Sequence, residues 1–269
     1  LGTVPVGADG SVAFKVPAGR ALHFQLLDGQ QRCLQVMRSF TVVMPGETRG
    51  CLGCHPMHST SPEGRSAVGA LRRTPSEIEP PPWGAGVSIG YERFCQPVLD
   101  KYCGRCHQGN GEGRAKLDLT LRGGVKEGGI EDPRLWPFKE PYLTLVGQAW
   151  GGPKPEGRGA ALGLAGCLNV EQHHQYGPLA PGRVLSSASP LIEMVTSGKH
   201  HDVRITGEDL LKLTAWVDCN CVYRGDEDVR QIPDPPPATD NRFPVPIRVR
   251  SAPRIERLQP VTDPPRKSG

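Results

Sequence analysis

Short apolar runs that partly alternate with polar residues fill the beginning of the chain. They cover residues 3–6, 10–16, 21–27 and 33–43, and glycine-containing turns separate several of them. Successive side chains of a strand point to opposite faces, so each run can bury one face against a neighbour. The pattern predicts a small β-sandwich-like segment over residues 1–58.

Two later segments carry a proline in the first turn of a predicted helix. The first helix should start near Gln96, and residues 98–102 then give it an apolar face. The second opens at Ser189-Pro190, continues through Val195 and stops at Gly198. Proline is tolerated at these positions because the first N–H groups of a helix have no partner within the helix.

A third helix is predicted after a sequence that resembles a capping box. Thr206 and Asp209 stand at the first and fourth positions of Thr-Gly-Glu-Asp, with Asp in place of the usual Glu. Apolar residues then recur at helical spacing through residues 210–217. Trp216 lies on this apolar face.

Proline and glycine divide the rest of the chain. Residues 59–90 are polar and proline-rich and predict a connector, and residues 91–225 predict a loop-rich, mainly helical domain whose section 109–185 is glycine-rich and irregular. Residues 226–269 form a proline-rich extended tail, which cannot bury enough apolar surface to fold alone. We therefore expect an α+β protein whose tail lies along its own domain or a neighbouring subunit.

The composition limits the possible functions. Hydrophobic residues make up 37% and aromatics 6% of the 269 residues, beside 34 Gly and 28 Pro, which indicates long loops and a modest core. The net charge is +4 without a long basic run, so the sequence carries no footprint for nucleic acid. No apolar stretch has the length of a transmembrane segment.

The strongest chemical signal is the pattern C-x-x-C-H, which occurs twice. Its members are Cys51, Cys54 and His55 in the first copy and Cys103, Cys106 and His107 in the second. This spacing is the attachment site of c-type haem. Two thiols form thioethers with the two vinyl groups of one porphyrin, and the following histidine supplies the proximal nitrogen to the iron. The sequence thus predicts two covalently attached haems.

Zinc knuckles or disulfides are the alternative explanation of the paired cysteines. A four-cysteine zinc site usually separates its two pairs by about 15–20 residues, whereas Cys54 and Cys103 stand much further apart. Zinc binding also gives no reason for a histidine directly after both pairs. The pattern therefore favours haem.

Haem attachment in turn predicts where the protein works. Covalent attachment takes place on the outer side of the bacterial inner membrane, so we expect an exported, periplasmic or extracellular protein, in a setting that permits disulfides. The chain begins at Leu1, without methionine or signal peptide, which is expected of a processed product or of a segment of a longer protein. Five further cysteines could pair, and because five is odd at least one stays free or pairs with another chain. They are Cys33, Cys95, Cys167, Cys219 and Cys221.

The axial ligands of each iron decide what the haem does. Two histidines favour low-potential electron transfer, whereas an open position permits substrate chemistry. His55 and His107 are the proximal candidates, and the distal candidates are His200 and His201, after a predicted helix end, and His173 and His174 in a loop. Each distal candidate could instead be a solvated loop histidine. The four methionines are weaker candidates, His58 is too close to His55 to reach the opposite haem face, and Trp216 fits a core position better than a haem contact.

Several segments resemble the carboxy-terminal haem-bearing part of the planctomycete-type hydrazine synthase alpha-subunit-like cytochromes. The resemblance covers about residues 1–225. It is carried by residues 2–11, 14–19, 37–40 and 45–49 before the first motif, by 96–100 and 117–120 around the second, and by 189–191, His200-His-Asp-Val203 and Leu213-Thr-Ala-Trp-Val-Asp-Cys-Asn220.

This resemblance implies different roles for the two haems. The second haem would have two histidine ligands and pass electrons, with its distal ligand at His200. In hydrazine synthase itself the first haem belongs to the catalytic centre and takes a tyrosine ligand shortly after the motif. Here His55 is followed by Pro-Met-His-Ser-Thr60, without a tyrosine. The resemblance therefore does not carry hydrazine-forming chemistry to this chain.

Three functions follow as hypotheses. The first is a dihaem cytochrome c that transfers electrons as a subunit of a larger extracytoplasmic complex, with other redox subunits as partners. The second is an enzyme whose first haem has an open face and acts on small nitrogen compounds. The third is a haem-stabilised structural subunit whose tail holds neighbours in a homo- or hetero-oligomer. The first is favoured, so we expect the chain to be an electron carrier more than a catalyst.

Overall fold

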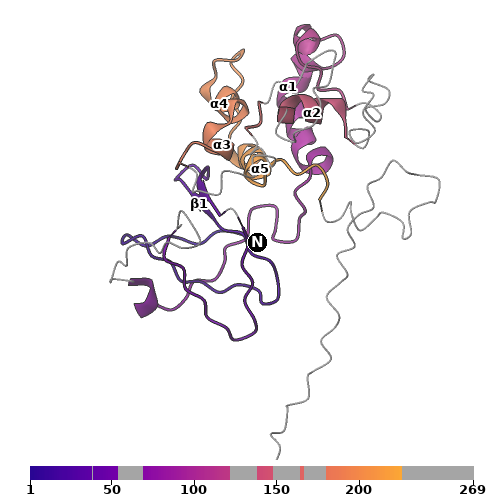
Figure 1. The fold of residues 1–269 in the computed structure, drawn as a ribbon. Coiled ribbons are helices and arrows are strands. Elements are labelled where there is room, and N and C mark those ends of the chain that lie inside the picture. Colours follow the sequence, from indigo (N-terminus) through magenta and orange to yellow (C-terminus); the bar gives the residue numbers. More distant parts are fainter. Residues whose placement is uncertain (38, 54–68, 122–137, 148–163, 167–179, 226–269) are drawn as a thin grey trace, which may run out of the picture.

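Helices form one part of the molecule, and the N-terminal residues lie beside them (Figure 1). The computed structural model describes residues 1–37, 39–53, 69–121, 138–147, 164–166 and 180–225. The strands are β1 (Gln25–Leu27) and β2 (Cys33–Val36), and the α-helices are α1 (Gln96–His107), α2 (Glu140–Val146), α3 (Leu185–Ala188), α4 (Pro190–Ser197) and α5 (Gly207–Asp218). Short non-α helical turns occupy Gly69–Arg72, Tyr91–Cys95 and Glu112–Ala115. The fold is therefore mixed α+β, as the sequence predicted.

The strands are fewer than a sandwich requires. Among the described residues, β1 and β2 form one antiparallel sheet of two strands, with Gln25 opposite Val36 and a bulge after Leu26. A sandwich needs two sheets that bury their inner faces against each other. The side chain of Phe40 is instead 67% exposed, so the alternating runs of the sequence do not all mark buried strands.

The described part of the predicted connector pairs with the first segment. Thr3 and Glu79 form an antiparallel bridge, and Phe14 and Ser76 form a parallel one. Both backbone bonds between Thr3 and Glu79 are 2.9 Å long. Proline removes backbone donors from residues 80–82, which agrees with single bridges in place of a long strand.

Two predicted helices are confirmed with their boundaries. α1 begins at Gln96 with proline in its first turn. Ser189 caps α4, because its hydroxyl accepts a hydrogen bond from the backbone N–H of Ile192, and Gly198 ends the helix with a left-handed φ of 70°. A β-carbon would disfavour that conformation, so glycine suits this position.

The capping box at the start of α5 was predicted and does not form. Thr206 is the N-cap residue of α5, but its side chain makes no capping hydrogen bond. The carboxylate of Asp209 instead binds side chains of α1. The helix α2 was missed, because residues 109–185 were expected to be irregular. Its signals are a proline in the first turn and Gly147 at the C-cap.

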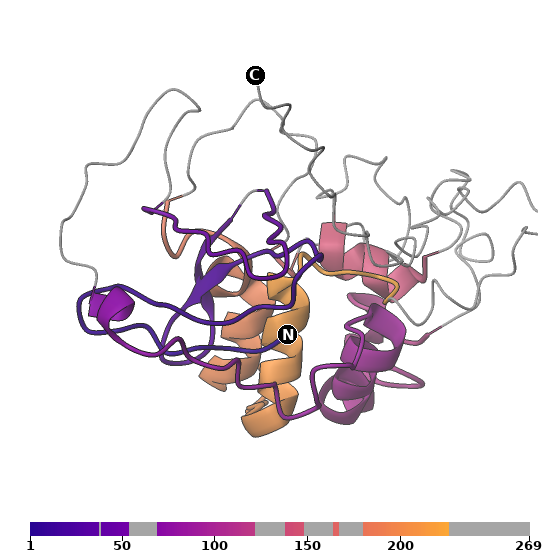
Figure 2. The same cartoon turned by 90° about the horizontal axis from the view of Figure 1, so that it is seen from below.

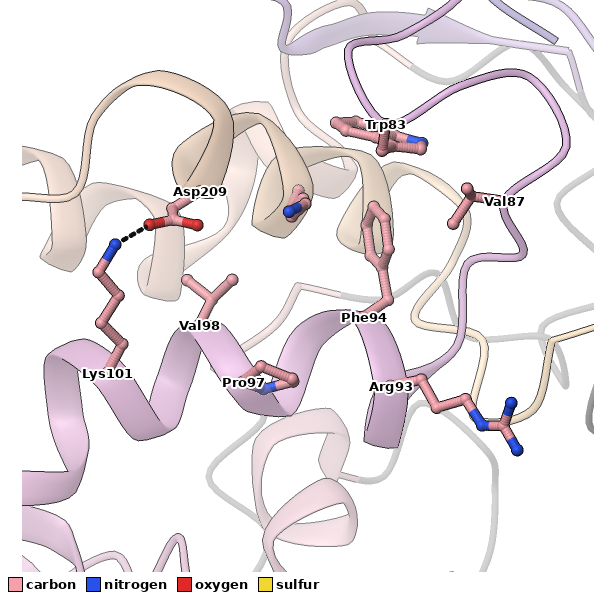
Figure 3. Close-up of a pocket in the computed structure, with 9 residues that line it drawn as sticks. Trp83, Val87, Arg93, Phe94, Pro97, Val98, Lys101 and Asp209 are labelled. Carbon is pink, nitrogen blue, oxygen red and sulfur yellow. Dashed lines mark hydrogen bonds and ion pairs between the residues drawn. The ribbon is translucent and has the colours of Figure 1, made fainter.

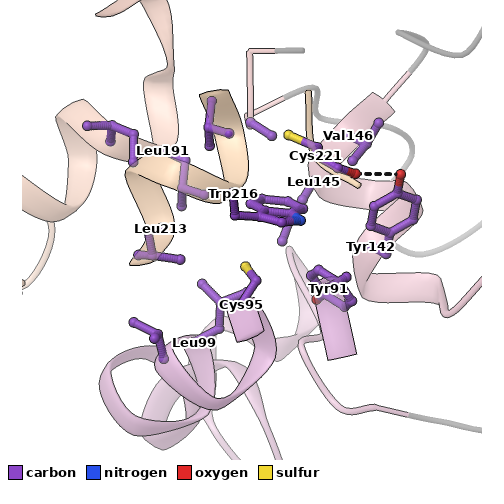
Figure 4. Packing of buried hydrophobic residues seen from close by; sticks show 14 of the residues in the cluster. Tyr91, Cys95, Leu99, Tyr142, Leu145, Val146, Leu191, Leu213, Trp216 and Cys221 are labelled. Carbon is purple, nitrogen blue, oxygen red and sulfur yellow. Dashed lines mark hydrogen bonds between the residues drawn. The ribbon is translucent and has the colours of Figure 1, made fainter. Parts of the chain in front are cut away.

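Aromatic residues from several helices meet in the core (Figure 4). Trp216 of α5 is fully buried and donates its indole N–H to the carbonyl of Val222 at 3.0 Å. Tyr91 and Tyr142 pack against the indole, at ring-centroid distances of 5.6 and 6.4 Å. The core role predicted for Trp216 is confirmed. The same cluster contains Cys33 and Val36, so β2 packs onto the helical part.

A buried carboxylate joins β2, α3 and α5. Asp218, at the end of α5, accepts hydrogen bonds from the N–H of Ser186 at 2.9 Å and from its hydroxyl at 2.8 Å. The hydroxyl of Ser186 in turn accepts from the N–H of Cys33 at 2.8 Å. Burial raises the pKa of Asp218 to about 6, against the lowering effect of the Ser186 hydrogen bonds. Contacts between neighbouring elements also give their order across the molecule, which is β2, α3, α5 and α1 (Figure 2).

Some predictions fall on residues outside this description. They concern Cys54, His55, His58, Cys167, His173, His174 and the tail 226–269. Within the described part of the chain, Cys33, Cys95 and Cys219 are free thiols. Among the helices described, none combines the length and apolar character that crossing a membrane requires.

Candidate haem site at the end of helix α1

The second C-x-x-C-H motif occupies the last turns of α1. Cys103 and Cys106 are three residues apart in a helix, so both side chains lie on the same face. Both are half-buried, as is His107, the final residue of the helix. The helix closes there because the N–H of Gln108 bonds the carbonyl of Gly104 at 3.0 Å. The two thiols and the imidazole that a c-type haem needs are thus gathered at one helix end.

A backbone carbonyl selects the tautomer of the His107 ring. Nδ1 of His107 lies 2.9 Å from the carbonyl oxygen of Leu117. A carbonyl can only accept, so Nδ1 is the donor, and in the neutral ring this tautomer leaves the lone pair on Nε2. Histidines that bind metals commonly have their second nitrogen in such a bond. The residues around Leu117 are held against the end of the helix by a second hydrogen bond. It runs from the N–H of Leu119 to the carbonyl of His107 and is 2.9 Å long.

Glycine at position 113 allows a backbone segment to approach the ring closely. A β-carbon on Gly113 would lie 2.7 Å from Cε1 and 3.0 Å from Nδ1 of His107. The φ of Gly113 is not in the left-handed region, so backbone conformation does not require glycine here. The closeness of the His107 ring is the reason why a larger residue would not fit. The imidazole is therefore held between the Leu117 carbonyl and the backbone of Gly113.

His200 faces His107 from another part of the chain. The centroids of the two rings are 5.9 Å apart, and their planes differ by 20°. Two imidazoles that bind one metal from opposite sides through bonds of about 2 Å have centroids roughly 6 Å apart. The separation of the ring centroids agrees with this value. Sequence separation gave no indication of this proximity, although His200 was the preferred distal candidate.

His201 is placed differently from its neighbour. Its ring packs edge-on against His200 at 4.9 Å, and the residue is exposed. Its φ of 48° is in the left-handed region, which turns the chain directly after His200. Of the two adjacent histidines, His200 is the one whose ring lies near that of His107 and nearly parallel to it.

The pKa values around the site favour the neutral forms of two groups. Burial, followed by the neighbouring His201 and His107, lowers the pKa of His200 and so favours the uncharged imidazole that a metal binds. Burial raises the pKa of Cys103 to about 11, with smaller contributions from Cys106 and Asp100. The thiol of Cys103 is accordingly protonated at neutral pH.

A carboxylate of α5 connects this helix end to the region of His200. Oδ2 of Asp209 accepts hydrogen bonds from Nζ of Lys101 at 2.7 Å and from the hydroxyl of Tyr102 at 3.0 Å. Figure 3 shows Lys101 and Asp209 pointing toward each other at one end of a surface pocket of about 340 Å³, with Trp83 at the other end. The sequence pattern predicts Asp209 as part of a helix cap and carries no signal of this contact with α1.

The first motif is described only in part. Cys51 is exposed, and Cys54, His55 and the distal candidate His174 lie outside the described residues. Within the described ranges, no group of three or more His, Cys, Asp and Glu side chains is arranged to hold a metal ion. What the described residues place together here is the pair of imidazoles of His107 and His200, with His107 on the same helix as Cys103 and Cys106.

The comparison with protein families supports the resemblance seen in the sequence. Residues 1–56 match the model of the hydrazine synthase alpha subunit middle domain. This segment is therefore similar to the middle domain of hydrazine synthase alpha subunits. The matched segment includes Cys51, Cys54 and His55, whereas the second motif lies beyond it. No curated protein and no solved structure matches the chain.

Proposed function

We propose that the chain is a dihaem c-type cytochrome that transfers electrons as a subunit of a larger extracytoplasmic complex. The observation that carries this proposal is the 5.9 Å placement of the His107 and His200 rings beside Cys103 and Cys106. A bound haem would supply an iron that takes up and releases one electron. The proposed setting is the periplasm or the cell exterior, where covalent attachment of haem takes place.

The residues at the second motif would have distinct tasks. Cys103 and Cys106 would bind the porphyrin covalently, and His107 would present Nε2 to the iron because Nδ1 is engaged with Leu117. His200 would occupy the opposite side and exclude water and small ligands. Two histidine ligands favour a low potential and leave no open position, which suits electron transfer better than substrate chemistry. Cys51, Cys54 and His55 would hold the first haem, with a distal ligand still to be assigned.

Spectroscopy of variants tests the ligand assignment. The measurement uses the full chain made in a bacterium that attaches haem, with Cys51 and Cys54 changed to serine so that only the second haem remains. His200→Ala should convert its ferric electron paramagnetic resonance signal from low spin to high spin. The matched control His201→Ala should stay low spin. A full conversion in the control alone would move the assignment to His201, and a protein that carries zinc without haem would overturn the proposal.

A haem enzyme at the first motif is the second candidate. It is favoured by the family match, because residues 1–56 contain the whole first motif and resemble a hydrazine synthase subunit. Changing Cys103 and Cys106 to serine would isolate the first haem. A high-spin haem that binds carbon monoxide without displacing a protein ligand would support action on small nitrogen compounds, and a fully low-spin haem would exclude it.

A further inference from the structure

The two histidines of the second site belong to elements that the chain does not hold together locally. His107 ends α1, and His200 lies in the connection between α4 and α5. Their separation therefore depends on how α5 and its preceding loop are positioned against α1. A contact that fixes this position also fixes the distance between the rings.

Asp209 makes such a contact in the first turns of α5. One oxygen of its carboxylate accepts hydrogen bonds from both Lys101 and Tyr102, the two residues just before Cys103. The ammonium of Lys101 also lies 4.9 Å from the centroid of the Tyr102 ring. The side chain of Asp209 is 23% exposed, compared with 62% for Lys101. Partial burial and two donors make this pair stronger than an ordinary surface ion pair.

The short loop before α5 transmits the position of the helix to His200. The carbonyl of His200 accepts the N–H of Val203 at 3.0 Å, and the N–H of Ile205 donates to Val195 of α4 at 2.8 Å. Asp202 has a φ of 58°, which is unfavourable for a residue with a β-carbon and persists where surrounding contacts hold it. The loop is thus folded on itself and tied to α4, and it continues directly into α5 at Gly207, so a displacement of α5 reaches His200 through the chain itself.

We propose that Asp209 is a positioning residue that keeps His200 opposite His107 and thereby controls whether the second haem stays closed to small ligands. The inference rests on the proposed haem at this motif. It adds that access to the iron is regulated by the contact between α1 and α5, at a residue that does not touch the haem ligands.

Carbon monoxide binding to the reduced protein measures this control. In the variant that retains only the second haem, Asp209→Asn should weaken the hold on α1 and raise the rate of carbon monoxide binding about tenfold, the effect expected for losing a hydrogen bond to a charged group. Tyr102→Phe removes one donor and should give a smaller increase. The matched control is Glu208→Gln, which removes the same charge from the same turn but only breaks the pair with Lys212 inside α5.

The outcomes separate the inference from the proposed function. Suppose that the haem is low spin before substitution and that Asp209→Asn and Glu208→Gln bind carbon monoxide at equal rates. This result would overturn the role of Asp209 and leave the proposed cytochrome function standing. Absence of haem at the second motif before any substitution would remove the proposed function and this inference together. If Asp209→Asn does not fold, the double variant Lys101→Gln, Tyr102→Phe decides by the same comparison.

Discussion

The ring of His107 lies so close to the backbone of Gly113 that a methyl group there would approach Cε1 to 2.7 Å. The imidazole also bonds the carbonyl of Leu117, four residues further along the chain. A single loop thus sets both the orientation and the tautomer of the candidate haem ligand. This loop follows α1 directly. The second C-x-x-C-H motif and the Leu117 carbonyl that orients its histidine are therefore close to each other in the sequence.

Gly113→Ala should therefore disturb the site. The added methyl group would force the ring or the loop to move, and overpacking of this kind costs about 1–3 kcal/mol. We expect a lower free energy of unfolding and, in the haem-bearing protein, altered low-spin g values. Denaturant titration and electron paramagnetic resonance measure the two effects.

Gly104→Ala is the matched control for this substitution. Its β-carbon would meet the end of the Gln108 side chain, at 2.8 Å, whose amide donates hydrogen bonds to Asp100 and to the Leu119 carbonyl. Alanine stabilises a helix interior by about 0.5–1 kcal/mol relative to glycine, which offsets part of the cost of moving that side chain, so this variant should lose less stability than Gly113→Ala. Equal losses in both alanine variants would contradict a specific contact between Gly113 and His107.

The pH dependence of stability should contain a contribution from Asp218. Its pKa is raised from 3.8 to about 6, chiefly by burial, so the folded protein holds the proton more tightly than the unfolded chain. The stabilisation is complete below pH 3.8 and is lost as the pH rises through about 6. Denaturant titrations between roughly pH 4 and pH 7.5 should show this decline.

Asp218→Asn removes the titrating group while keeping a similar shape. Relative to the parent protein, its free energy of unfolding should decline less between those pH values. The nearby Asp28 also contributes to the raised pKa of Asp218, so Asp28→Asn should shift the decline to lower pH. Parallel profiles for the parent protein and Asp218→Asn would show that the carboxyl group does not titrate in this range.

The helix caps offer a paired test of α4 and α5. Ser189→Ala removes the hydroxyl that accepts the N–H of Ile192, and such losses cost about 1 kcal/mol. Thr206→Ala should cost much less, because the side chain of Thr206 makes no capping bond. Thermal or denaturant unfolding measures both. If Thr206→Ala lowers the free energy of unfolding more than Ser189→Ala does, Thr206 caps α5 in solution as its sequence indicates.

Local patterns predicted the ends of helices well where a single residue, such as proline, serine or glycine, is enough to start or stop the helix. Proline at the start of α1 and the pair Ser189 and Gly198 around α4 act within a single turn, so no distant residue can override them easily. The capping box failed because Asp209 has better donors available on α1 than the backbone of its own turn. The sandwich failed because alternation alone does not supply a second sheet to cover the exposed face of the runs.

By itself, the sequence predicts covalent attachment of haem, because C-x-x-C-H brings two thiols and an imidazole together within five residues. It also named His200 as the preferred partner of His107 through family resemblance. Only the tertiary structure decided that the two rings face each other at 5.9 Å. That distance depends on the packing of α5 against α1 through Asp209, and contacts between elements far apart in the chain leave no periodic signal in the sequence.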